Sequence, residues 1–565
     1  MGGIKNNEFI DTVAAALDIE RMYKDALAFS KLHRYSGSAD GEKAVDIILQ
    51  RMSQFGVSAE RIEYEFYRSL PVFSELTINF GGEKRTYKAT PFVYSGECEN
   101  LSAKIVFDKG YVPGTKSHRL LQAERCNNFK GNIVFTYDSS FDFILMAKKY
   151  GAVAIVTSWP LDIAHHGTAG RVWGIPEPFD LDYKYPEIPY TELLKSNADE
   201  LLELLDIGDV SGILTVKMDN GIKKSSMAIA DIKGASDKYV LISGHYDSWY
   251  EGMTDNGVAN VAMVDIARVF KENEGQLYRG VKLAWWSGHS DGRYSGSTWY
   301  YDNYFEDLKK NCVAHINMDI CGCKGSDLVG FNSSTLEGKD FTREFLFAYN
   351  EGEPPAADRM IRFADQTFWG ANIPFAIMPK FSVKDIETQP FYWWHTPEDG
   401  IDKVDKSIMQ RDAEVIIKLA AYFAQIYPLP AHFDEFICLM ENRLKEIAGN
   451  LSEAFDLSRI YPKLDILKDV TNRLMCKLPK IQDSDDIILK AAGELARISF
   501  TYGSPYQQDE AVERGLFPVL SSAMGINDKN TDPLYLLAYK NAFLRQVNRV
   551  CSQLDNVIQT IESVL

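Results

Sequence analysis

The sequence lacks several features that would direct it to a membrane, to nucleic acid or to the exterior of the cell. No apolar run reaches the ~18–20 residues that a membrane-spanning helix requires. Eight cysteines are scattered over 565 residues, which excludes the dense disulfide framework of small secreted domains. Basic residues are in the minority, and the net charge of -18 argues against nucleic acid and anionic membrane as main partners. The start, Met-Gly-Gly-Ile-Lys, lacks the pattern of a signal peptide, so we expect a cytoplasmic protein in a reducing compartment.

The length and the distribution of apolar residues predict an α/β protein of several domains. Residues 8–56 have the spacing of amphipathic helices, and residues 57–68 alternate like a strand. Short β runs and one short helix fill the stretch from about 75 to 225. Buried strands are expected at 239–242, 281–285 and 313–318, with a helical pattern between the first two, which indicates a parallel sheet. After about residue 405 the pattern is helical throughout.

Five residues of metal-binding type stand at the ends of apolar runs or beside them. They are His245, Asp255, Asp291, Asp319 and His395. Two histidines and three carboxylates are the donors that a pair of zinc ions sharing one carboxylate requires. Alone, each residue has an ordinary interpretation: Asp255 could cap the helix expected to start at Gly257, and the others could be solvated loop residues. Together they predict a metal centre beyond the carboxyl ends of the parallel strands.

A carboxylate near the first histidine completes this pattern. His245 and Asp247 are two residues apart, so their side chains point to the same side of an extended backbone. Asp247 is therefore placed to orient a ligating imidazole.

These motifs resemble a known family of enzymes. The runs Gly244-His-Tyr-Asp-Ser248, Thr254-Asp-Asn-Gly-Val258, Asn317-Met-Asp319 and His395-Thr-Pro-Glu-Asp399 are similar to those of the co-catalytic zinc aminopeptidases. The layout resembles the subgroup of glutamate carboxypeptidase II and the transferrin receptor. That resemblance implies a zinc-exopeptidase-like domain at 1–75 and 226–425. It also implies an inserted protease-associated β-rich domain at 76–225 and a helical domain at 430–565 that forms a homodimer.

The resemblance also implies roles for the five residues. One zinc ion would bind His245 and Asp319, the other would bind Asp291 and His395, and Asp255 would bridge them. The implied reaction is hydrolysis of an amide bond, with up to two zinc ions per chain. The substrate class is a small peptide or an N-acyl amino acid.

The sequence departs from the family where the general base is expected. The family has two consecutive glutamates, a base and a ligand, and anchoring on Gly296-Ser297 without gaps aligns them with Ser290 and Asp291. A serine hydroxyl cannot act as that base near neutral pH. The neighbouring His289 could supply the function, because imidazole titrates in the right range, or it could simply line the pocket.

Further departures concern the substrate side. Trp394 stands where glutamate carboxypeptidase has a tyrosine, and Tyr392 is nearby. Arg293 could hold a substrate carboxylate or anchor its own loop. His165 and His166 lie in a segment that could reach over the cleft and contact substrate, or could be an ordinary loop. The stretches Asp365–Phe368 and Gly370–Pro374 resemble the family's substrate-side loop.

Three functions are compatible with these features. The first is a zinc-dependent peptidase or amidohydrolase with an altered base. The second is a weakened or inactive member that acts as a binding or scaffold protein. A single-metal cyclotransferase similar to glutaminyl cyclase is a third, and it fits less well because His245 and Asp319 would keep a second metal site.

Overall fold

The fold is seen in a computed structural model that describes most of the chain. The described residues are 8–110, 122–333, 373–382 and 392–565, without 482, 502, 511–515 and 530, together with isolated residues between 336 and 368. Within these ranges, no helix is both long enough and apolar enough to cross a membrane.

Parallel strands form the centre of the sheet that carries the predicted metal residues. In spatial order they are β9 (Arg279–Trp286), β8 (Ser236–His245), β10 (Cys312–Asn317) and β13 (Phe375–Ser382). All neighbouring pairs in this group are parallel. The sheet continues with β11 (Leu328–Ser333), antiparallel to β13, and β12 (Ala357–Arg359). The predicted strands at 239–242, 281–285 and 313–318 and the mostly parallel α/β fold are confirmed.

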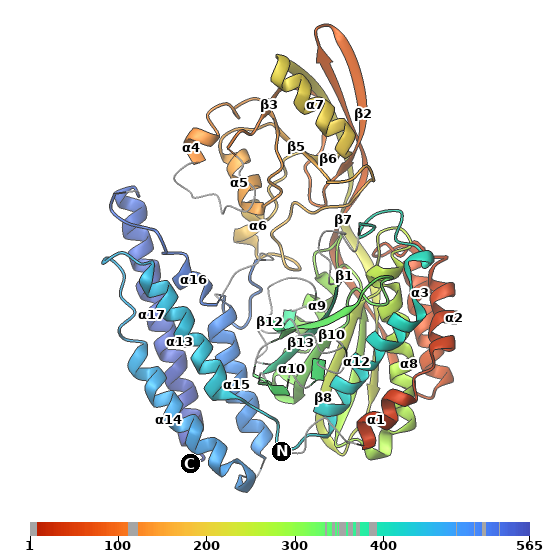
Figure 1. The fold of residues 1–565 in the computed structure, drawn as a ribbon, viewed down its shortest axis with the longest axis vertical. Coiled ribbons are helices and arrows are strands. Elements are labelled where there is room, and N and C mark those ends of the chain that lie inside the picture. Colours follow the sequence, from red (N-terminus) through yellow and green to blue (C-terminus); the bar gives the residue numbers. More distant parts are fainter. Residues whose placement is uncertain are drawn as a thin grey trace.

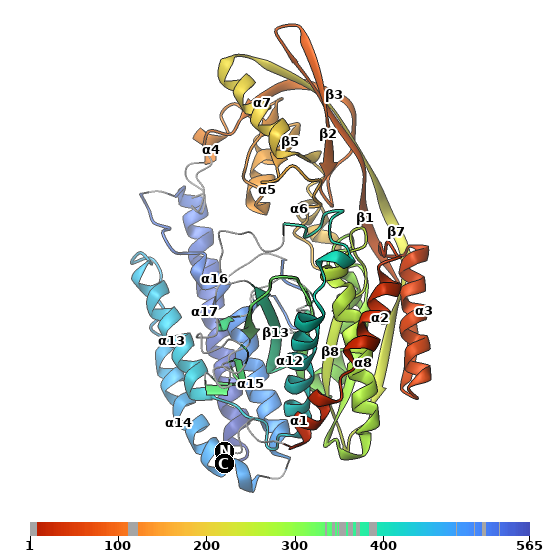
Figure 2. The same ribbon diagram turned by 45° about the vertical axis from the view of Figure 1, so that its right-hand side comes forward.

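Helices cover both faces of this sheet because its strands are apolar on both sides (Figures 1 and 2). One face packs on a large core, and several of the helices that contribute to it cover the sheet directly. The contributing helices include α1 (Glu8–Ala15), α2 (Ile19–Phe29), α3 (Ala39–Gln54), α8 (Val258–Glu272) and α12 (Lys406–Gln425). The other face buries Tyr239 and Leu241 against α9 (Ser295–Asn303) and α10 (Phe305–Asn311). The helical pattern between the first two strands is therefore α8, as the periodicity predicts.

A long two-stranded ribbon connects this sheet to an inserted module. The strands β1 (Ser58–Phe80) and β7 (Val210–Ile232) pair antiparallel over nearly their whole length. The strand expected at 57–68 is confirmed, but it is longer than expected and ends at Phe80. Its ladder with β7 continues past a single irregularity between Pro71 and Phe73. The domain limits expected near 75 and 225 fall inside these two strands.

The module stands at one end of the molecule, above the sheet in Figure 1. Its strands are β2 (Glu83–Pro91), β3 (Cys98–Phe107), β4 (Ile133–Phe135), β5 (Ala154–Ser158) and β6 (Tyr190–Leu193). Its helices are α4 (Gln122–Arg125), α5 (Phe141–Lys149), α6 (Leu181–Lys184) and α7 (Lys195–Ile207). The predicted β runs and the short helix near Phe141 are confirmed.

The C-terminal region is helical, as predicted, and lies beside the central parallel sheet (Figure 1). It consists of α13 (Phe433–Gly449), α14 (Tyr461–Lys477), α15 (Ser484–Phe500), α16 (Pro518–Ser521) and α17 (Pro533–Glu562). A buried ion pair ties it to the sheet: the Arg279 guanidinium at the start of β9 bonds to Asp485 on α15 and to the carbonyls of Phe423 and Ile426.

Candidate functional site

The first two predicted ligands meet because their strands are parallel neighbours. His245 is the last residue of β8, and Asp319 follows the end of β10. Their side chains approach at the same edge of the sheet, with 3.3 Å between His245 Nε2 and Asp319 Oδ1. Both residues are buried. The expectation that metal-type side chains gather beyond the carboxyl ends of the strands describes this pair correctly.

Asp255 lies between the two predicted histidines. Its Oδ1 is 3.1 Å from His245 Nε2, and its Oδ2 is 3.2 Å from His395 Nε2. Asp255 is not the N-cap of the following helix: Gly257 holds that position in α8, and the two Asp255 carboxylate oxygens face imidazoles instead. Burial opposes ionisation of Asp255, but the two imidazoles hold its pKa well below the ordinary value. The carboxylate is thus placed to serve two positive centres at once.

Both histidines present Nε2 to the carboxylates because their Nδ1 atoms are occupied. The Nδ1–H of His245 donates to the Asp247 carbonyl at 2.9 Å, and that of His395 donates to the His166 carbonyl at 2.8 Å. A backbone carbonyl on one ring nitrogen fixes the tautomer and leaves the other nitrogen available to a metal.

Asp247 orients His245 through its backbone rather than through its carboxylate. Its Oδ1 is 3.6 Å from His245 Nδ1, while its Oδ2 accepts hydrogen bonds from Ser36 Oγ and from the His289 backbone N–H, both at 3.0 Å. The Asp247 carboxylate therefore joins the loop after β9 to the segment that contains Ser36.

Asp291 is buried near these residues but has different partners. Its Oδ2 accepts a hydrogen bond from the Ser36 backbone N–H at 3.2 Å. Burial, and then the charge of Asp247, raise the pKa of Asp291 to about 7. Among the contacts of the described residues, none joins Asp291 to Asp255 or His395. Its role as a ligand beside His395 stays a prediction.

His289 lies directly on the metal-type cluster. Its ring stacks on that of His245 with 3.7 Å between centroids. Its Nδ1 is 2.9 Å from Asp365 Oδ2, and Asp365 in turn accepts a hydrogen bond from Ser297 Oγ at 2.6 Å. Ser290 is half-buried on the same turn. Of the loop expected on the substrate side, Asp365 and Phe368 are described, whereas Gln366 and 370–372 lie outside the described residues.

Aromatic rings line the His395 side of the cluster. Trp394 stacks on His395 with 3.7 Å between ring centroids, and the His165 ring is 5.8 Å from that of His395. The His166 backbone N–H also donates to the His395 carbonyl at 3.2 Å, so both backbone polar groups of His166, in the inserted module, are bonded to His395. His165 and His166 are therefore beside a predicted ligand.

The remaining substrate candidates differ in their surroundings. Tyr392 is 38% exposed, so its ring is accessible. Arg293 donates to the Tyr294 hydroxyl at 2.8 Å and lies over the same ring, a contact that anchors its own loop. Both interpretations of Arg293 stay open, because a half-buried guanidinium with this contact keeps further donors.

Two buried residues that support the site were missed by the motif analysis. The Arg34 guanidinium donates to the carbonyls of Tyr246, Glu251 and Gly252 at 2.8 to 2.9 Å, and so holds the loop between His245 and Asp255. Asp399 accepts hydrogen bonds from the backbone N–H groups of Thr254 and Asp255. Asp399 is the last residue of the His395-Thr-Pro-Glu-Asp399 motif, so the sequence did point to it. Arg34 lies in a helix-and-turn segment that contains no motif, so its role could not be predicted from the sequence.

The donor set fits divalent cations. Carboxylate oxygens of Asp247, Asp255 and Asp291 are buried without a hydrogen-bond partner. Asp255 Oδ1 is one of them although His245 Nε2 is only 3.1 Å away, so the two atoms are close without being aligned for a hydrogen bond. Ligand atoms of His245, His289 and Asp319 also lie within 4.8 Å of one another. Oxygen and imidazole donors of this kind suit zinc.

Comparison with known proteins identifies the part of the chain that carries this cluster. Residues 228–420 match the profile of Peptidase family M28. Over this segment the chain is similar to the M28 peptidases. The resemblance to the co-catalytic zinc aminopeptidases is thereby confirmed for the residues that carry the motifs.

The M28 relatives include a plant protein and bacterial enzymes of known structure. The maize probable glutamate carboxypeptidase VP8 is 34% identical over 105 residues, which cover 18% of this chain and 14% of the relative's length. The aminopeptidase from Aneurinibacillus sp. strain AM-1 has a TM-score of 0.56 at 22% identity and covers 74% of this chain and 96% of its own. The zinc aminopeptidase of Bacillus subtilis has a TM-score of 0.53 at 19% identity, with 72% and 95% coverage. These structures share the M28 fold.

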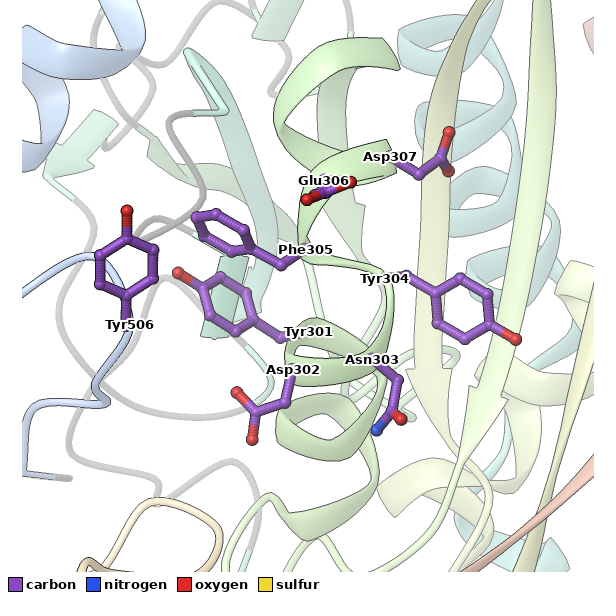
Figure 3. A pocket seen from close by; sticks show the side chains of 8 residues that line it. All are labelled: Tyr301, Asp302, Asn303, Tyr304, Phe305, Glu306, Asp307 and Tyr506. Carbon is purple, nitrogen blue, oxygen red and sulfur yellow. The ribbon is translucent and has the colours of Figure 1, made fainter.

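A cavity of about 760 Å³ lies at the turn between α9 and α10, apart from the predicted ligands (Figure 3). The rings of Tyr301, Phe305 and Tyr506 gather on one side of it, and Asp302 and Glu306 add carboxylates. None of its lining residues is of the predicted metal or substrate set, so this cavity is not the candidate site.

Proposed function

We propose that this chain is a zinc-dependent metallohydrolase that cleaves an amide or peptide bond. Its substrate would be a small peptide, an N-acyl amino acid or a related compound. The observation that carries the proposal is Asp255, whose two oxygens face two imidazoles at 3.1 and 3.2 Å. A carboxylate bridging two metal ions has this arrangement, and the M28 match of residues 228–420 supports the same chemistry.

Each residue of the cluster has a part in this proposal. His245 and Asp319 would hold one zinc ion, His395 and Asp291 the other, and Asp255 both. When bound, the ions supply a Lewis acid for the substrate carbonyl and lower the pKa of a water molecule. The protein fixes the two ligating imidazoles through the carbonyls of Asp247 and His166.

The general base is altered in this proposal. Ser290 has no acid–base capacity near neutral pH. His289 is the imidazole that contacts the cluster, and two roles are open to it, general base and metal ligand. Activation of water by metal alone supports hydrolysis, and a missing base reduces its rate by roughly 10²–10⁴-fold.

The walls of the site favour an aromatic or apolar substrate group. Trp394 and His165 present rings beside His395, and His166, Tyr392 and Arg293 complete the proposed substrate contacts. Arg293 would bind a substrate carboxylate with a donor that its contact with Tyr294 leaves available.

A second candidate function is a binding or scaffold protein without efficient catalysis. The replacement of the family's glutamates by Ser290 and Asp291 favours it. Retention of both histidines and of the bridging carboxylate favours the enzyme, because a scaffold has no need for the buried, mutually repelling carboxylates of Asp247 and Asp291.

The assembly and compartment are also part of the proposal. A homodimer through the helical C-terminal region would cover the apolar side chains of Leu534, Leu537 and Leu544, which are 72, 56 and 51% exposed on α17. All eight cysteines are free, which supports a reducing compartment such as the bacterial cytoplasm.

One experiment tests the proposed enzyme. The purified chain is analysed for zinc and then assayed, before and after removal of metal by a chelator, on aminoacyl, N-acyl and acidic dipeptide substrates. We expect bound zinc and hydrolysis that is lost with the metal and restored by zinc. Protein that binds no zinc and hydrolyses none of these substrates after zinc addition would refute the proposal. Bound zinc without hydrolysis of any of them would favour the scaffold.

A further inference from the structure

We propose that His289 is an additional ligand of the zinc ion at His245 and Asp319, and that Asp365 holds its imidazole in position. The inference rests on the proposed function, because the ion concerned is the one assigned to that pair. It differs from the expectation that His289 is a general base, since a ligand is needed to retain the metal and a base is not.

The first observation is the closeness of three potential ligand atoms. His245, His289 and Asp319 each offer one such atom, and all three atoms lie within 4.8 Å of one another. Donors about 2.0–2.1 Å from a tetrahedral zinc ion are about 3.3 Å apart. The His289 ring is half-buried, follows β9 directly and stacks on the ring of His245, so the proposal needs the imidazole to move closer to Asp319 when the ion binds.

The second observation is the hydrogen bond on the other ring nitrogen. His289 Nδ1 is bonded to Asp365 Oδ2 at 2.9 Å, so its Nε2 is available, as in His245 and His395. A carboxylate on the outer nitrogen is the usual partner of a zinc-binding histidine. By contrast, the buried His315 uses Nε2 for a hydrogen bond with Ser243 at 2.8 Å.

The third observation is that Asp365 is itself fixed. It is 1% exposed, and its Oδ1 accepts a hydrogen bond from Ser297 Oγ at 2.6 Å. The Ser297 hydroxyl also lies 3.0 Å from the Thr367 hydroxyl. The Thr367 hydroxyl in turn accepts a hydrogen bond from Trp173 Nε1 at 2.8 Å. Burial of the Asp365 carboxylate costs desolvation free energy. In this proposal the carboxylate holds the imidazole of His289 in the orientation that a zinc ligand needs.

The consequence is that the two zinc sites are unequal. The ion at His245 would have four protein donors, from His245, Asp255, Asp319 and His289, which is the closed set of a tightly held ion. The ion at His395 would have fewer described donors and would keep open positions for water and substrate. We therefore expect one tight and one weak zinc site in each chain.

The test measures zinc binding and needs no substrate. Zinc affinity is determined by competition with a chromophoric chelator for the full-length protein and for His289→Ala, His289→Gln and Asp365→Asn. Cobalt(II) replaces zinc in parallel, because its visible absorption reports the donors around the ion. His432→Ala is the matched control, since His432 is 39% exposed and far from the predicted ligands in the chain.

We expect both His289 variants to lose the tight site and to change the cobalt spectrum. Asp365→Asn should weaken the tight site by about 10–100-fold, as loss of an orienting partner does. His432→Ala should behave like the unaltered protein. Tight binding and an unchanged cobalt spectrum in folded His289→Ala protein would overturn the inference and leave the proposed function standing. Absence of any zinc binding by the unaltered protein would overturn both.

Discussion

The buried guanidinium of Arg34 offers a sharp test of how the site is held in place. Arg34 is fully buried and donates to the carbonyls of Tyr246, Glu251 and Gly252, which belong to the loop between His245 and Asp255. Burial lowers its pKa to about 10, although the charges of Asp399, Asp247 and Asp255 oppose that shift. It remains a cation at neutral pH and compensates part of the negative charge of these three carboxylates.

The structure allows the effect of Arg34→Met to be worked out. At roughly 1.5 kcal/mol for each hydrogen bond from a charged donor, the three short bonds to this loop are worth about 4–5 kcal/mol. A loss of that size lowers the apparent Tm of a domain of ~200 residues by roughly 10 °C. Zinc ions would restore positive charge beside the same carboxylates. The loss should therefore be smaller in the presence of zinc than in chelator.

Thermal unfolding of both proteins, with zinc and with chelator, measures this difference. Arg34→Lys keeps the charge but has fewer donors, so it should recover part of the loss in chelator. Arg51→Met is a suitable control, because Arg51 is also paired with a buried carboxylate, Asp25, away from the site. An Arg34→Met protein with an unchanged Tm in chelator would refute this account, as would a loss that zinc does not reduce.

Three other variants test separate parts of the molecule. Asp255→Ala should remove both zinc ions, because this residue is placed as the bridge, and full zinc content in that protein would contradict the assignment. Asp485→Ala leaves the Arg279 guanidinium buried without its partner and should destabilise the chain by about 3–5 kcal/mol. Chemical denaturation measures the effect, and the double variant Arg279→Met with Asp485→Leu should recover much of it. Ser290→Glu should raise hydrolysis of generic aminoacyl anilides, by up to ~10²–10⁴-fold. Unchanged rates in a zinc-loaded Ser290→Glu protein would show that position 290 is not where the family's base acts.

The fold was predictable wherever residues repeat with a regular period. The strands β8, β9 and β10 are short apolar runs, and α8 and the C-terminal helices carry apolar residues at helical spacing. The meeting of His245 with Asp319 follows from these patterns, because neighbouring parallel strands end at the same edge of a sheet. The length of β1 did not follow, since its ladder with β7 continues past an irregularity that no local pattern reveals.

Side chains that reach the site from irregular segments were harder to predict. Asp365 stands in a stretch without periodicity, so its hydrogen bond with His289 depends on tertiary structure alone. The position of Asp247 two residues after His245 was informative, but the atom that orients the imidazole is its carbonyl oxygen. Motif spacing identifies residue types that can serve a site; it does not tell which atom of a residue is used.

The ribbon of β1 and β7 has a consequence for the order in which the protein folds. Its ladder pairs Ser58 with Asp231 at one end and Asn79 with Ser211 at the other, so every pair closes a loop that contains the whole inserted module. Closing such a loop costs less entropy when the module between its ends is already compact. The module is therefore expected to acquire structure before the ribbon forms. Pulse-labelled hydrogen exchange during refolding should protect β4 and β5 earlier than β1 and β7.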